Sequence, residues 1–278
     1  MLIVPIWLVA MGWVVAHDVL PGFLAEDPPH LHVSEWLRNE GRKTQYAITG
    51  EDGSRLGTIW ARYIIDDDLL HRDELIWIES LPESLNRLLP FRQLRIDVTS
   101  SYSADGALDE ITLRIQTKDG EIRLHGERFH ADFSFELDAG RDVPKRVFKV
   151  PLTDGRIIAG GLNPFSHLSN IKVGQKWRMQ VINPITVILP NLGRRFIVML
   201  VEVTGREMLR TGDGLVDCLV VESGSSKAWV NEHGVVIAQE TTLPLVGRIR
   251  VEREPFFDED ERVRIRKIPW TRIGGDNG

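Results

Sequence analysis

The fold of this chain is decided by the stretch Lys227-Ala-Trp-Val-Asn-Glu-His-Gly-Val-Val-Ile-Ala-Gln-Glu240. An apolar segment that contains Trp229 leads into the polar tetrapeptide 231–234, and a second apolar segment begins directly after it. Gly234 can adopt the positive φ that a tight turn between two strands requires. The stretch therefore predicts a β-hairpin, in which residues 231–233 form the turn and carry no chemistry.

Apolar and polar residues alternate with a period of two along most of the chain between residues 45 and 256. Leu94, Ile96 and Val98, for example, alternate with Arg95 and Asp97. Strict alternation is typical of antiparallel strands that have one face buried and the other in water. The further apolar positions of this pattern are Tyr46, Ile48, Ile59, Ala61, Tyr63, Ile111, Leu113, Ile115, Ile122, Leu124, Phe129, Phe133, Phe135 and Leu137. Residues 196–203 are nearly all apolar instead, which predicts a strand buried on both faces.

These segments predict a mainly β fold with about a dozen strands and one or two short helices. The clearest helix signal is residues 80–83 (SLPE), which resemble a capping box and begin a segment that ends at Pro90. A sheet this large must curl into a barrel or split into two packed layers. We expect one large curved antiparallel sheet, an open or half barrel, over residues 45–256. Residues 257–278 then form a charged tail or edge strand.

Residues 2–16 form an uncharged apolar segment, LIVPIWLVAMGWVVA. As a helix this segment would be ~22 Å long, short of the ~30 Å hydrocarbon core of a bilayer. Its length and the small residue Ala16 suit a cleaved secretory signal, whereas the apolar residues that continue to Leu24 suit a retained membrane helix; a buried core helix is the third alternative. We expect a signal anchor or signal peptide at 1–24 and a linker with a short helix at 25–44. The bulk of the chain is then outside the cytoplasm, in the periplasm.

Short segments in the C-terminal half carry a family resemblance: 162–165 (LNPF), 173–177 (VGQKW), 203–207 (VTGRE), 217–222 (DCLVVE) and 228–235 (AWVNEHGV). Over residues 160–255 the chain resembles exported bacterial β-rich proteins of unknown function. The resemblance implies a LolA-like fold, which is an open barrel of antiparallel strands around helices. Such regions are similar to those found ahead of transglutaminase-like domains in envelope proteins. The matching motifs are turns and strands, so the resemblance implies no catalytic residue.

Composition and motifs argue against several functions. The formal net charge of −6 disfavours a nucleic-acid partner, because neutralising phosphates needs a concentrated basic surface. Cys218 is the only cysteine, and its aliphatic neighbours indicate a packed thiol rather than a nucleophile. His30 and His32 lie in a proline-rich linker, which favours solvated side chains over a metal site. No nucleophile elbow or phosphate-binding loop is present in the sequence, so we expect no catalytic site, metal or cofactor.

The positive functional indication is the dry concave face that such a sheet would have. Five aromatic residues are the candidate ligand contacts on this face: Phe129, Phe133, Phe135, Trp177 and Trp229. A face of this kind can hold an acyl chain; the alternative is that an inserted helix and the same rings fill the space. We expect a noncatalytic, membrane-associated envelope protein that binds a membrane lipid or other apolar ligand, or docks a membrane-protein partner. The rival hypotheses are an accessory or structural subunit of an envelope or transporter complex and, third, an enzyme.

Overall fold

The computed structural model describes residues 29, 43–66, 69–80, 93–103, 106–117, 120–130, 132–140, 144–151, 156–158, 165, 168–182, 196–212, 214–243 and 247–257. Several predictions fall outside these ranges: the apolar segment 1–24, the helix expected at 81–90, His30, His32 and the charged tail after 257. Within the described ranges every element is a strand, and no helix there has the length and hydropathy to cross a bilayer.

Fifteen strands make up the described part of the chain. The first eight are β1 (Lys43–Gly50), β2 (Arg55–Asp66), β3 (Leu69–Ile78), β4 (Leu94–Tyr102), β5 (Leu108–Thr117), β6 (Gly120–Phe129), β7 (Asp132–Asp138) and β8 (Arg146–Pro151). The other seven are β9 (Arg156–Ile158), β10 (Lys176–Ile182), β11 (Phe196–Thr211), β12 (Gly214–Ser223), β13 (Ser226–Val230), β14 (Val236–Leu243) and β15 (Gly247–Glu254).

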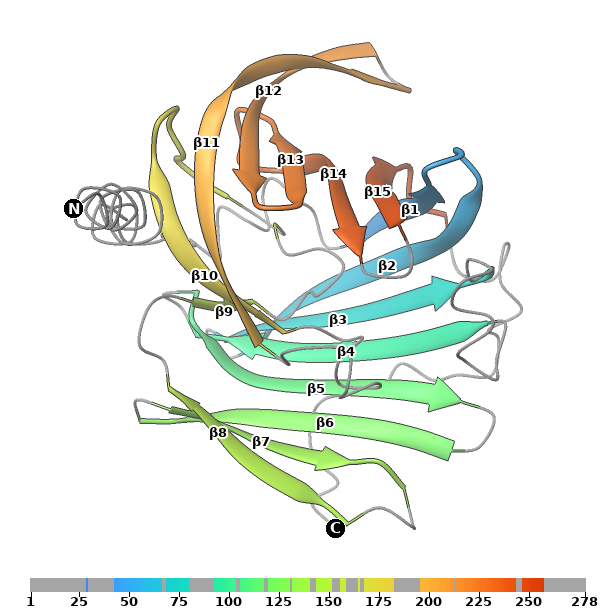
Figure 1. Ribbon diagram of the computed structural model, residues 1–278, viewed down its shortest axis with the longest axis vertical. Helices are drawn as coiled ribbons and strands as arrows, with labels where there is room; N and C mark the ends of the chain where they lie inside the picture. Colours follow the sequence, from blue (N-terminus) through green and yellow to red (C-terminus); the bar gives the residue numbers. More distant parts are fainter. Residues whose placement is uncertain are drawn as a thin grey trace, which may run out of the picture.

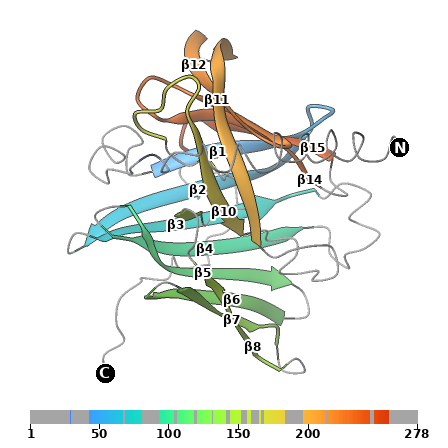
Figure 2. The same cartoon turned by 60° about the vertical axis from the view of Figure 1, so that its left-hand side comes forward.

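All fifteen strands belong to one sheet in the order β8-β7-β6-β5-β4-β3-β2-β1-β15-β14-β13-β12-β11-β10-β9. Neighbouring described strands are antiparallel, apart from the parallel pair β9 and β10. The sheet is strongly curved, and its edge strand β9 returns close to β5 without pairing with it (Figures 1 and 2). The predicted mainly β fold with one large antiparallel sheet is confirmed, and the sheet is not closed. Strand β9 lies in the glycine-rich segment 154–161.

The centre of the sheet joins the two ends of the described chain, because β1 pairs with β15. The buried side chain of Gln45 holds this junction together. Its amide nitrogen donates a hydrogen bond of 2.7 Å to Glu254 Oε1. Its amide oxygen accepts hydrogen bonds from Trp60 Nε1 and from the Phe257 backbone amide, both at 3.0 Å. Both polar atoms of this buried side chain are therefore paired, as stable burial of an amide requires.

One face of the sheet carries the apolar positions predicted from the alternation, and we call it the inner face. The strand register places Ile59, Ile76, Ile96 and Ile115 side by side across β2, β3, β4 and β5. All four side chains are buried in one hydrophobic cluster, which extends from β15 through β1 to β7. The predicted sharing of one face by these strands is confirmed.

A second hydrophobic cluster continues the inner face onto β10–β14 and includes Trp177 and Val221. The opposite, outer face is not exposed to solvent everywhere. Trp60 on β2 and Leu75 on β3 are buried there, because they are out of phase with the inner-face isoleucines on the same strands. This part of the sheet is therefore covered on both sides, whereas the alternation predicted one dry face.

The hairpin predicted from residues 227–240 is present as β13 and β14. Gly234 has a φ of 80°, and Asn231 Oδ1 accepts hydrogen bonds from the backbone amides of His233 and Val235 at 3.0 and 2.9 Å. A Cβ atom at position 234 would lie 2.8 Å from the carbonyl oxygen of Leu168. Glycine is thus required twice: for the turn and for the close approach of the backbone at residue 168.

Strand β11 differs from the prediction that residues 196–203 are buried on both faces. Val201 and Val203 are buried on the inner face, but Val198 and Leu200 on the outer face are exposed. The apolar run therefore has one covered side, and its outer side is a patch of exposed apolar surface.

The second half of β11 pairs only with β12 among the described strands, because β10 pairs with residues 196–202. The two strands consequently project together beyond the rest of the sheet (Figure 1). A register shift between Val203 and Gly205 marks the start of the projection. Met208 and Leu215 are exposed on it.

Candidate ligand-binding site

Phe133 and Phe135 lie on the inner face of β7, where the alternation placed them, and both are fully buried. Their ring centroids are 4.9 Å apart, and Phe135 stacks on Phe148 of β8 at 5.4 Å. Gly126 on β6 makes room for this packing, since a Cβ atom there would lie 2.5 Å from a ring carbon of Phe135. These rings fill the inner face next to the edge strand β8.

Phe129 lies on the outer face and is 58% exposed, which corrects its place among the aromatic residues expected on the inner face. The alternation runs through residues 129–137 without a break, but the chain turns at His130, whose φ is 56°. Phe129 is therefore the last residue of β6, where it pairs with Asp132. On β6 it is out of phase with the inner-face residue Leu124.

Trp177 on β10 is buried on the inner face, in the second hydrophobic cluster. Phe165 and Leu168, from the chain before β10, belong to the same cluster. Part of the inner face of β13 and β14 is polar, where the hydroxyls of Ser226 and Thr241 are hydrogen-bonded at 2.7 Å. Trp177 is therefore in a different cluster from Phe133 and Phe135, and the structure does not bring these three rings together.

Trp229 lies on the outer face, which corrects the expectation that it points inward. Its neighbours on β13, Ala228 and Val230, occupy the second inner cluster, whereas Trp229 packs against Cys218 and Ala238 on the opposite side. The indole Nε1 donates a 2.8 Å hydrogen bond to the carboxylate of Glu207. The polar edge of the ring is thus satisfied without a ligand.

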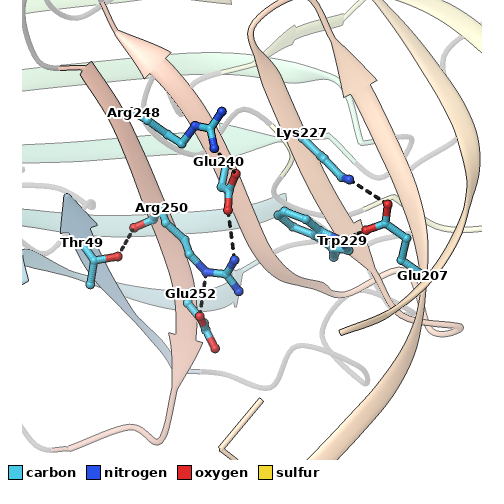
Figure 3. A network of polar contacts seen from close by, with 8 residues as sticks. All are labelled: Thr49, Glu207, Lys227, Trp229, Glu240, Arg248, Arg250 and Glu252. Carbon is cyan, nitrogen blue, oxygen red and sulfur yellow. Dashed lines mark hydrogen bonds and ion pairs between the residues drawn. The ribbon is translucent and has the colours of Figure 1, made fainter. Parts of the chain in front are cut away.

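A network of charged side chains surrounds Trp229 on the outer face (Figure 3). The cationic groups of Lys227 and Arg250 lie 4.9 and 5.3 Å from the indole centroid. Lys227 also pairs with Glu207 at 2.8 Å, and Arg250 pairs with Glu240 at 3.0 Å. Hydrogen bonds from Lys227, which has the larger effect, and from Trp229 lower the pKa of Glu207. Exposed ion pairs of this kind contribute about 0–1 kcal/mol each, so the network links β11, β13, β14 and β15 with a modest contribution to stability.

The inner face also carries an ion pair, between Arg72 and Glu74 on β3, that the sequence did not reveal. Arg72 Nη2 donates a hydrogen bond to Glu74 Oε2, and each side chain is 2% exposed. Both residues are in phase with Leu70 and Ile76, so they point to the same apolar side of the sheet. Removing such charges from water costs several kcal/mol per ion, so their burial requires a specific arrangement of partners.

The strand register places Tyr63 and Ser100 on either side of Arg72, on β2 and β4. The Tyr63 ring centroid is 5.9 Å from the guanidinium carbon. Burial lowers the pKa of Arg72, but the Glu74 carboxylate and the nearby tyrosines, Tyr63 and Tyr102 among them, outweigh it and raise the pKa above its ordinary value. Arg72 is therefore a permanent cation inside the fold.

Three buried polar atoms, on this pair and on its neighbour in β4, have no hydrogen-bond partner among the described residues: Arg72 Nε, Glu74 Oε1 and Ser100 Oγ. Thr44 Oγ1 is also unpaired among them, but Thr44 lies two strands from Glu74, on the far side of the small residue Ala61. A buried polar atom left unpaired costs about 1–3 kcal/mol. The arrangement therefore favours any added group that can donate to or accept from these atoms.

His71, Asp73 and Ser101 form another polar group, on the outer face of β3 and β4, where His71 lies opposite Ser101. Burial raises the pKa of Asp73, and the charges of His71 and Arg62 oppose this shift. His71 Nδ1 and Asp73 Oδ1 have no hydrogen-bond partner within the described ranges. The three residues thus lack the hydrogen-bonded chain that activates a serine nucleophile.

Cys218 is fully buried in the middle of β12, so the predicted packed thiol is confirmed. Burial, together with the nearby Asp217, raises the pKa of the thiol to about 11. The thiol is therefore protonated at neutral pH and a poor nucleophile. In the part of the chain that the structure describes, no group of three or more His, Cys, Asp and Glu side chains could hold a metal ion.

The described part of the chain is therefore a mainly β protein built on one open, curved antiparallel sheet. A comparison with protein-family models found no match, and a comparison with curated proteins found no significant match. Among solved structures, the chain is similar to a β-barrel-like protein of domain of unknown function DUF1849 from Brucella abortus. The TM-score is 0.38 at 11% identity, over 83% of this chain and 97% of the other. It is also similar to a DUF1089 family protein from Pseudomonas aeruginosa, with a TM-score of 0.36 at 16% identity over 64% and 87% of the two chains.

Proposed function

We propose that this protein is a noncatalytic binding protein that holds a lipid or other apolar ligand against the inner face of its sheet. The proposal is carried by the apolar lining of this face across both halves of an unclosed sheet. Curved β-sheets with apolar interiors can enclose one small ligand. The edge strands β8 and β9 are not paired with each other, so the edges can separate without breaking a hydrogen-bonded ladder.

A LolA-like, half-barrel character and a location outside the cytoplasm are parts of the same proposal. They are supported by the resemblance carried by residues 162–235 and by the uncharged apolar segment 2–16. A protein held at a membrane surface has lipids within reach, which suits an apolar-ligand carrier.

The test is the binding of the fluorescent probe N-phenyl-1-naphthylamine to the full-length chain after lipid removal on a hydrophobic resin. We expect saturable binding of one probe per chain. Met199 is partly buried beside the second inner cluster, so Met199→Trp should fill space on the inner face and weaken binding several-fold. Val198→Trp, at the exposed neighbouring position on the outer face, is the matched control and should bind like the wild type. A wild-type protein without saturable binding would refute the proposal.

A docking role, as an accessory subunit of a membrane complex, is favoured by a different observation. Met208 and Leu215 are exposed on the projecting part of β11 and β12, and the register places them on the same face. Exposed apolar groups concentrated on a projection are typical of contact surfaces. Replacing both with Glu should reduce the size of the native complex extracted from membranes and leave probe binding unchanged. A complex of unchanged size would argue against this role.

A further inference from the structure

The polar group on the inner face is not explained by apolar ligand binding, which needs an apolar lining alone. We call Arg72, Glu74 and Ser100 the polar subsite. The three residues come from two neighbouring strands, β3 and β4, and each is at least nine-tenths buried. Each contributes one buried polar atom without a hydrogen-bond partner among the described residues.

The free atoms of the polar subsite combine donors and acceptors in equal measure. Arg72 Nε can only donate and Glu74 Oε1 can only accept, while the hydroxyl of Ser100 can do either. Because Arg72 and Glu74 also form an ion pair with each other, their formal charges cancel. An anionic group would be attracted to Arg72 but repelled by the free carboxylate oxygen, and a cationic group would meet the reverse. The matching partner is an uncharged group that both donates and accepts, such as a hydroxyl.

The polar subsite borders a row of buried apolar side chains that crosses several strands. Ile76, two residues after Glu74 on β3, belongs to the row of isoleucines that crosses β2 to β5 on the inner face. These isoleucines are at most 3% exposed, so a ligand with its head at the polar subsite would lay an alkyl chain against this hydrophobic cluster by displacing the groups that cover it.

We propose that the polar subsite binds the uncharged, hydroxyl-bearing head of an amphipathic lipid of the long-chain alcohol or monoacylglycerol class. The inner face holds the alkyl chain of the same molecule. This inference rests on the proposed function, which requires only that an apolar ligand binds, and adds the chemistry of the head group.

The experiment compares three probes that share one chain and differ only in the head: 1-dodecanol, dodecanoate and dodecane. Each competes with N-phenyl-1-naphthylamine for the full-length, lipid-stripped protein. We expect 1-dodecanol to bind about tenfold more tightly than dodecane, which corresponds to ~1.4 kcal/mol. Dodecanoate should bind no more tightly than the alcohol.

Three variants locate the preference. Ser100→Ala removes one free hydroxyl with little change in volume and should reduce the preference for the alcohol over dodecane several-fold. Ser101→Ala, the next residue on β4 and on the outer face, should leave it unchanged. The double variant with Arg72→Met and Glu74→Leu keeps an apolar lining without leaving a lone charge, so it should bind dodecane and lose the preference.

The outcomes separate the two proposals. If none of the probes displaces N-phenyl-1-naphthylamine and the fluorophore itself does not bind, the proposed function is wrong. If the alcohol and dodecane bind equally well, the head-group assignment is wrong and the apolar-ligand function stands; the polar subsite then holds ordered water only. If dodecanoate binds more than tenfold tighter than the alcohol, the subsite selects an anion and the assignment to an uncharged head is overturned.

Discussion

Replacing one member of the Arg72–Glu74 pair should destabilise the fold far more than replacing both. Each side chain is 2% exposed, so Glu74→Leu leaves a guanidinium without its counter-charge in apolar surroundings. Loss of one partner from a buried ion pair costs about 3–5 kcal/mol. Arg72→Met leaves the carboxylate alone in the same way. The double variant removes both charges together with their desolvation cost, and its stability should lie between that of the wild type and about 4 kcal/mol above it.

Equilibrium urea denaturation of the full-length, lipid-stripped protein measures these effects as shifts of the transition midpoint. The exposed pair of Arg206 and Asp217 is a suitable control, because its atoms are equally well placed at 2.7 Å but its side chains are 58% and 53% exposed. Arg206→Met should therefore cost at most about 1 kcal/mol. The comparison isolates burial as the cause of the larger effect.

Two results would refute this reasoning. If the double variant is destabilised by the sum of the two single effects, the two side chains do not interact. If Glu74→Leu alone is as stable as the wild type, the Arg72 side chain reaches water and the pair is not on a covered face.

Three further predictions concern residues whose environment is equally specific. Gly126→Ala should destabilise the protein by about 1–3 kcal/mol in urea denaturation, because its Cβ would lie 2.5 Å from Phe135; Gly205→Ala, with open space around it, should change stability by less than ~0.5 kcal/mol. Gly234→Ala should cost more than Gly224→Ala, because both positions have positive φ but only the Cβ at 234 meets the backbone of Leu168; equal costs would mean that backbone strain of about 1–2 kcal/mol is the whole effect. Since the raised pKa of about 11 keeps the Cys218 thiol protonated below that pH, 5,5′-dithiobis(2-nitrobenzoate) should label it at pH 8 only after unfolding, and rapid labelling of the native protein would contradict its burial.

The strands of this fold could be predicted because their apolar residues recur at every second position. The four isoleucines of β2, β3, β4 and β5 are the clearest case, since they meet across the sheet on one covered face. The turn at residues 231–234 could be predicted because Gly234 is needed at positive φ. In these places the local signal and the tertiary structure agree.

The aromatic lining could not be predicted from the alternation because the face of a residue depends on where its strand ends. The turn at His130 carries none of the usual glycine, asparagine or proline signals, and without it Phe129 counts as an inner residue. On β13 Ala228 and Val230 share one face, and Lys227 and Trp229 share the other. Because each face carries an apolar residue, the alternation alone does not say which of them is the inner face. The choice is made by pairing with β12, where Val221 lies opposite Ala228.

The buried ion pair could not be predicted from the sequence because it lies in a charged segment. Residues 71–74 are His, Arg, Asp and Glu, which is the composition of a surface loop. The buried members can be recognised only by their positions in the period-two alternation: Leu70, Arg72, Glu74 and Ile76 occupy alternate positions of one strand. A charged residue in phase with buried neighbours on both sides is the signal that would have identified the polar subsite.

The pairing of β1 with β15 sets the order in which this protein can be completed during synthesis. Gln45 and Glu254, which are hydrogen-bonded across the junction, are 209 residues apart in the chain. A ribosome that adds 5–20 residues per second needs roughly 10–40 s to make the partner of β1 after β1 itself has been made. Throughout that interval β1 presents an unpaired edge to other nascent chains, and contacts of such long sequence separation form slowly even afterwards. The two halves of the sheet are thus joined last, and a holding chaperone should increase the yield of the full-length protein more than it does for a β protein whose strands pair in sequence order.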